Sequence, residues 1–101
     1  MYLNVHEMPH VWYVDDDSES LQAAGYGLMD EAEVMTFQSP SAALAALKLN
    51  TPVEVIISDL QMPGMNGLEF LQKVAEINPD IVAILVTDLS GKTRIQTLPP
   101  R

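Results

Sequence analysis

The 101-residue sequence has no cysteine and few basic residues. Without cysteine the chain has no disulfide framework, no thiolate metal site and no thiol nucleophile, which suits a reducing compartment such as the cytoplasm. Five Lys and Arg stand against 14 Asp and Glu, so the net charge is −9, and no Lys or Arg precedes Lys48. Because such a surface repels phosphate backbones and anionic lipids, we expect no direct contact with nucleic acid or membranes.

The sequence also lacks a long hydrophobic run. Its apolar stretches are far shorter than the roughly 20 residues that a membrane-spanning helix needs. Its N-terminus does not show the basic and then apolar pattern of a secretory signal. At 48% hydrophobic and 19% charged residues, the composition is that of a globular chain. We therefore expect one small domain with a core of its own.

Short apolar segments alternate with segments of helical periodicity along the chain. This alternation predicts a βαβαβαβ pattern, and hence a parallel sheet with helices on both faces. The predicted strands cover residues 11–14, 33–37, 53–58 and 81–86, and the predicted helices cover 18–30, 41–49 and 68–77. We expect an N-terminal extension over 1–9, the α/β domain over 10–87 and an irregular tail over 88–101. Trp12 and Tyr13 should face opposite sides of the first strand.

Three acidic residues fall at the carboxyl ends of two predicted strands. Asp15 and Asp16 follow the first strand, and Asp59 follows the third. In the flavodoxin-like strand order 2-1-3-4-5 these strands are neighbours, roughly 4.8 Å apart. Carboxylates held so close resist joint ionisation, and a hard cation such as Mg²⁺ relieves that conflict. A carboxylate beside Mg²⁺ can also attack phosphorus and form an aspartyl phosphate.

A simpler interpretation stands beside the metal site. An Asp-Asp-Asp run before a helix can serve only as a helix cap, and Asp59 can be a turn residue. What favours the metal site is the joint pattern: a strand with an Asp pair, then a strand with Asp59 and a loop. That loop contains Met62-Pro63-Gly64 and Asn66-Gly67.

Three segments together resemble the receiver domain of two-component response regulators. Residues 11–17 resemble its first-strand motif, 55–67 its phosphoacceptor strand and loop, and 84–87 its fourth strand. The resemblance implies a flavodoxin-like fold and a signalling module that is not an enzyme. It also implies a location in the cytoplasm and a partner that donates phosphate, either a histidine kinase or a phosphotransfer protein.

The same resemblance implies roles for five residues. Asp59 would be the phosphorylated nucleophile. Asp15, Asp16 and Asp59 would hold Mg²⁺, with the backbone carbonyl of Gln61 as a further ligand. Thr87 would bind the phosphoryl group and report its presence. Phosphoryl transfer depends mainly on positioning and charge neutralisation, so this short list suffices for much of the task.

The resemblance ends after Thr87. The family continues with a helix and a fifth strand that ends in Lys-Pro, and its lysine lies much further along the chain than Lys92 does here. We therefore assign no equivalent of that lysine. Asp88 adds a negative charge beside the site. We interpret residues 88–101 as a truncated or divergent ending.

The sequence leaves open two alternatives to a phosphoacceptor function. The chain can be a receiver-derived interaction or dimerisation module with impaired phosphorylation. It can also be a phosphatase of the haloacid-dehalogenase type, because Asp15 and Asp17 have that motif's first spacing, although Glu19 does not fit it. Without a fifth parallel strand, residues 81–86 would form an exposed edge. We expect residues 93–98, after a Ser90-Gly91 turn, to pack on that edge or on a neighbouring copy, which favours a homodimer.

Overall fold

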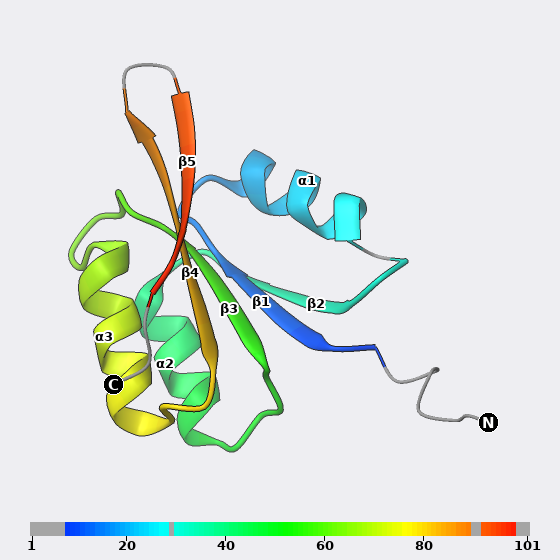
Figure 1. Cartoon of the computed structure of the whole chain (residues 1–101), viewed down its shortest axis with the longest axis vertical. Helices are drawn as coiled ribbons and strands as arrows, with labels where there is room; N and C mark the ends of the chain where they lie inside the picture. The colour runs from blue at the N-terminus through cyan, green and yellow to red at the C-terminus, as the bar shows by residue number, and fades with distance from the viewer. Residues whose placement is uncertain (1–7, 29, 90–91, 99–101) are drawn as a thin grey trace.

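The computed structural model describes residues 8–28, 30–89 and 92–98 as one sheet with helices on both faces (Figure 1). The strand order is β2-β1-β3-β4-β5. The elements are β1 (His10–Val14), α1 (Ser18–Leu28), β2 (Glu33–Phe37), α2 (Pro40–Lys48), β3 (Val55–Asp59), α3 (Gly67–Ile77), β4 (Val82–Leu89) and β5 (Lys92–Thr97). The flavodoxin-like fold is confirmed. Each predicted element is present, with β2 at the predicted bounds and the other elements shifted at one or both ends by a few residues.

Helices α2 and α3 begin where local chemistry satisfies their first backbone N–H groups. The Ser39 hydroxyl accepts a hydrogen bond from the Ala42 N–H at 3.2 Å, and Pro40 follows in the first turn. Before α3, the Asn66 side chain accepts from the Glu69 N–H at 2.8 Å, and the Glu69 carboxylate accepts from the Asn66 N–H at 3.1 Å. This reciprocal capping box fixes the start of α3 just after the loop that follows β3.

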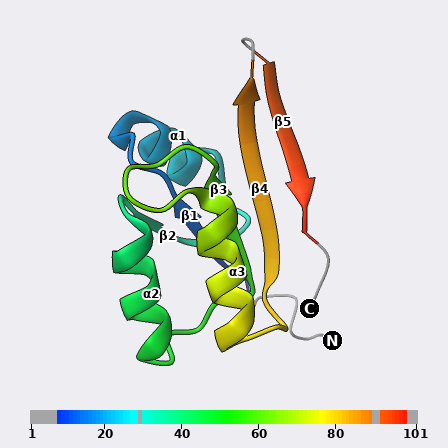
Figure 2. The same ribbon diagram turned by 90° about the vertical axis from the view of Figure 1, so that its left-hand side faces the viewer.

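The hydrophobic core lies between the sheet and the pair α2 and α3, which pack side by side on one face (Figure 2). Helix α1 covers β1 and β2 on the other face. Trp12 is fully buried in the core and Tyr13 is only partly buried, as strand alternation predicts. The side chains at the centre of the core are Trp12, Val14, Ile56, Phe70, Leu71, Val74 and Leu85. Among the described residues, no helix is long and apolar enough to span a membrane.

The tail corrects one prediction. Residues 92–97 are not irregular: they form β5, which runs antiparallel to β4 with Ile95 opposite Val86. Beyond β5, the Leu98 N–H donates to the Ala83 carbonyl at 2.9 Å, and Leu98 packs against the core. The expectation that this segment covers the edge of the fourth strand is confirmed within one chain. The predicted Ser90-Gly91 turn and residues 1–7 lie outside the described residues.

The β4–β5 hairpin extends past the ends of the other strands in both views (Figures 1 and 2). It extends on the side where β1 and β3 end, because β4 runs parallel to them and continues beyond the residue paired with Asp59. β4 and β5 therefore extend beyond the carboxyl ends of β1 and β3.

At Gly67 the start of α3 approaches the backbone of β3 closely. A Cβ added there would overlap the Asp59 carbonyl oxygen and lie 2.9 Å from the carbonyl carbon, both backbone atoms that cannot move aside. We expect Gly67→Ala to lower the free energy of unfolding by about 1–3 kcal/mol, as overpacking does. The measurement is urea denaturation followed by Trp12 fluorescence.

Gly25 is the matched control. It lies inside α1, and a Cβ there would meet nothing within 4 Å. Gly25→Ala should stabilise the chain by about 0.5–1 kcal/mol, because Ala is the better helix former. Equal effects of the two substitutions would contradict the close approach of α3.

Candidate functional site

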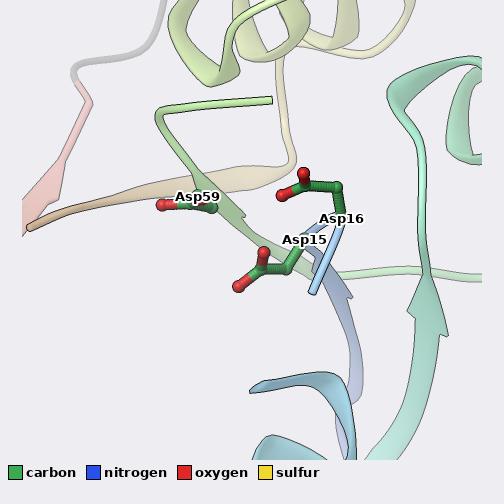
Figure 3. A group of neighbouring side chains, drawn as sticks. All are labelled: Asp15, Asp16 and Asp59. Atoms are coloured by element: carbon green, nitrogen blue, oxygen red, sulfur yellow. The ribbon is translucent and has the colours of Figure 1, made fainter. Parts of the chain in front are cut away.

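Two adjacent strands bring three carboxylates together at one edge of the sheet. Asp15 and Asp16 follow directly after β1, and Asp59 is the last residue of β3. The two strands are parallel neighbours, so their carboxyl ends meet. Oxygen atoms of the three carboxylates all lie within 4.8 Å of one another (Figure 3). The apolar strands thus place three like charges around one point, as their sequence positions predict.

The carboxylates line an open cleft of about 420 Å³. Its lining residues are Tyr13, Asp15, Asp16, Asp17, Ser20, Asp59, Gln61 and Val86. Among these described residues there are four carboxylates and no basic side chain. Gln61 is among the lining residues, and the role of its backbone carbonyl as a metal ligand stays a prediction. Thr87 is buried on β4, one residue beyond the position paired with Asp59.

Asp17 does the capping work that the simpler interpretation gave to the whole acidic run. One of its carboxylate oxygens accepts from the Glu19 N–H at 3.2 Å, and the other accepts from the Ser20 hydroxyl at 2.9 Å. Asp15 accepts from the Asp17 N–H at 3.0 Å. These bonds fix the turn between β1 and α1. The structure therefore gives the acidic run two tasks, because Asp17 caps α1 while Asp15 and Asp16 meet Asp59.

The electrostatics of the cleft disfavour its negative charge. Burial is the main cause that raises the pKa of Asp15, and the carboxylates of Asp59, Asp16 and Asp17 add to it. The hydrogen bond from the Asp17 N–H opposes this shift. Burial also raises the pKa of Tyr13, with further contributions from Asp15 and Asp59. The described lining residues therefore include no positive charge that would stabilise the ionised carboxylates.

The donor set of the cleft fits a hard divalent cation. Its carboxylate oxygens come from two strand ends, and the cleft is open enough for water. Mg²⁺ takes oxygen ligands, usually one or two carboxylates, and keeps several of its waters. The cluster of Asp15, Asp16 and Asp59 could therefore hold such an ion.

Two residues of the cleft were not singled out by sequence reasoning. Tyr13 was interpreted only as a strand residue at the rim, and Ser20 as part of a helix. The signal for Tyr13 was available, because residues two apart on a strand share a face and Asp15 is two residues further on. For Ser20 the signal is its place three residues after Asp17, within the first turn of α1.

Comparisons with known proteins agree on one family. The protein-family model described as the response regulator receiver domain matches residues 11–98. The hydrogenase transcriptional regulatory protein HoxA of Cupriavidus necator is 43% identical over 77 residues, and the DNA-binding transcriptional regulator NtrC of Salmonella typhimurium is 39% identical over 82. Each match covers 76% of this chain, and the chain spans only 16% of the length of each relative.

Solved structures show the same likeness. A response regulator receiver domain protein from Clostridium thermocellum has a TM-score of 0.73 at 28% identity, over 79% of this chain and 65% of its own. An uncharacterised protein from Neptuniibacter caesariensis has a TM-score of 0.69 at 40% identity, over 72% of this chain and 54% of its own.

The raised pKa of Asp15 predicts a pH dependence of stability. A raised pKa in the folded state means that Asp15 favours folding below its unfolded value of 3.8. This contribution is lost as the pH rises through the folded value. In metal-free buffer, we expect the stability of Asp15→Asn relative to the unsubstituted chain to increase as the pH rises above about 4. Asn keeps the oxygen that accepts from Asp17. Denaturation followed by Trp12 fluorescence measures the difference.

Asp80→Asn is the control, because Asp80 is exposed and lies at the opposite end of the sheet, just before β4. It removes one carboxylate that does not line the acidic cleft, and it is measured beside Asp15→Asn at each pH. A pH-independent difference for Asp15→Asn would show that its burial and its acidic neighbours do not act as described.

Proposed function

Since the chain belongs to the response regulator receiver domain family, a family of signalling modules, we propose that it accepts a phosphoryl group on Asp59 in a two-component phosphorelay. The observation that carries this proposal is the meeting of Asp15, Asp16 and Asp59 within 4.8 Å in an open cleft. The donor would be a histidine kinase or a phosphotransfer protein. Because phosphohistidine is made with ATP, the proposal places the exchange in the cytoplasm.

The position of Asp59 supports its role as the nucleophile. It ends β3, which lies between β1 and β4 in the sheet. On the β1 side it meets the pair Asp15 and Asp16, and on the β4 side Thr87 lies one residue beyond its paired position. Asp15 is only 6% exposed and its carboxylate binds the turn before α1, so it is less able to receive a phosphoryl group.

The proposed roles of the other residues follow from this arrangement. Asp15, Asp16 and Asp59 would hold Mg²⁺, together with the backbone carbonyl of Gln61. The bound ion would offset the negative charge of the carboxylates and of the incoming phosphoryl group. Thr87 would bind the phosphoryl group with its hydroxyl.

The transfer needs little covalent help from the protein. A carboxylate oxygen of Asp59 forms a bond to phosphorus, while the bond from phosphorus to the donor nitrogen or oxygen breaks. The leaving group departs with that electron pair. The chain's contribution is to align the carboxylate and to exclude competing geometries. The protein is then an acceptor rather than an enzyme that turns over a small substrate.

Nucleic acid is not among the proposed partners of this chain. The curated relatives include proteins described as DNA-binding regulators, but the matched region is a small part of them. The chain itself carries a net charge of −9, which repels a phosphate backbone.

Phosphorylation is tested with acetyl phosphate and Mg²⁺. We expect one phosphoryl group per chain, located on Asp59 by mass spectrometry of borohydride-trapped peptides. Asp59→Asn should abolish the modification, and Asp80→Asn should leave it intact because Asp80 lies far from the cleft. EDTA or Asp16→Ala should suppress it strongly, since the carboxylates then have no bound cation.

The outcomes separate the two candidate functions. A modified residue other than Asp59 would overturn the assignment. No modification at all would favour the second candidate, an interaction module that keeps the receiver fold. The observation that favours this second candidate is β5, which runs antiparallel beside β4 and gives the described chain a new sheet edge.

We also propose that the chain forms a homodimer through that edge. β5 is the last strand of the sheet, so one row of its backbone groups faces away from β4. Ile95 in β5 is 70% exposed, an unusual exposure for a large apolar side chain in a strand. Light scattering at high micromolar concentration should give the mass of a dimer, and Ile95→Lys should give that of a monomer, because lysine blocks edge pairing.

Leu49→Lys is the matched control, since Leu49 is 79% exposed just after α2 and far from the β5 edge. It should remain dimeric. A strictly monomeric unsubstituted chain, or a dimer that persists in Ile95→Lys, would contradict the proposed homodimer through β5.

A further inference from the structure

Tyr13 shares one face of the sheet with the acidic residues. It lies in β1, two residues before Asp15. Its pairing partner in β3 is Ile57, which lies two residues before Asp59. Residues two apart in a strand point to the same side. Adjacent strands lie about 4.8 Å apart and rise about 3.3 Å per residue, so positions offset by two residues lie roughly 8 Å apart, within reach of an aromatic side chain. Tyr13 lines the cleft together with Asp15 and Asp59.

Tyr13 is partly exposed, like His10 at the start of β1. Val11, Trp12 and Val14 are buried, and Tyr13 is the β1 residue that lines the cleft. A phenol is an apolar ring with one polar end, and that end needs a hydrogen-bond partner or water. Its hydroxyl is neutral near pH 7, so it is a donor in a cleft otherwise lined with carboxylates.

A phosphoryl group in this cleft would need hydrogen-bond donors. It brings three strong acceptor oxygens and additional negative charge. Among the described lining residues none is basic, and the Ser20 hydroxyl donates to Asp17. Gln61 is exposed and also lines the cleft. Tyr13 therefore offers a neutral donor on the sheet face that carries Asp59.

We propose that the Tyr13 hydroxyl donates a hydrogen bond to the phosphoryl group carried by Asp59 and so contributes to its transfer. This inference rests on the proposed function, because it requires phosphorylation of Asp59. It assigns Tyr13 to the phosphoryl group and not to the cation, since a neutral phenol is a donor toward anions.

The experiment compares Tyr13→Phe with Tyr26→Phe and the unsubstituted chain. Both substitutions remove one phenolic oxygen, but Tyr26 is 70% exposed on α1 and does not line the cleft. The initial rate of Asp59 phosphorylation by acetyl phosphate is followed by mass spectrometry at a fixed Mg²⁺ concentration. Loss of one hydrogen bond should slow Tyr13→Phe by about 2- to 10-fold, with Tyr26→Phe unchanged.

A second measurement separates this role from a structural one. The Mg²⁺ affinity of each variant is measured by isothermal titration calorimetry, which needs no reporter side chain in the cleft. We expect it to be unchanged in Tyr13→Phe while the rate falls. An unchanged rate, or a rate loss that simply follows a loss of Mg²⁺ affinity, would overturn the inference and leave the proposed function standing. If the unsubstituted chain shows no modification of Asp59, the proposed function fails and this inference falls with it.

Discussion

Mutual repulsion of carboxylates at the ends of β1 and β3 is the constraint on which the rest of the structure depends. Asp15, Asp16 and Asp59 meet only when the chain is folded, since Asp59 lies 43 positions after Asp16 in the sequence. The apolar core under these strands must therefore outweigh a local cost. That core is supplied by Trp12, Ile56 and the buried faces of α2 and α3. Folding energy is thereby used to hold a charge arrangement that favours a cation.

The parallel part of the fold was open to prediction from the sequence for a physical reason. Strands buried on both faces are short and apolar, and they stand out between helices of regular periodicity. The order of parallel strands then brings Asp15, Asp16 and Asp59 to one edge. The capping signals at Ser39 and Asn66 are equally local, so the starts of α2 and α3 were predictable within a residue.

The remaining features depend on tertiary context. The direction of β5 is set by whether the chain crosses over or turns back after β4, and the segment around Thr93 and Ile95 carries no strong signal for either. Tyr13 stands in an apolar run, and its position two residues before Asp15 is the one local sign of the face that it shares with the acidic residues. The division of labour between Asp17 and its neighbours Asp15 and Asp16 appears only when the hydrogen bonds of the turn are known.

The contact at Gly67 has a mechanical consequence. The Gly67 N–H donates to the Leu60 carbonyl at 2.7 Å, and its Cα rests against the Asp59 backbone with no side chain between them. Side chains can absorb a small displacement by changing rotamer, whereas two backbones in direct contact cannot. A displacement of the Asp59 main chain would therefore displace the first turn of α3 directly. The main chain that carries Asp59 at the cleft and the first turn of α3 thus lie in direct backbone contact.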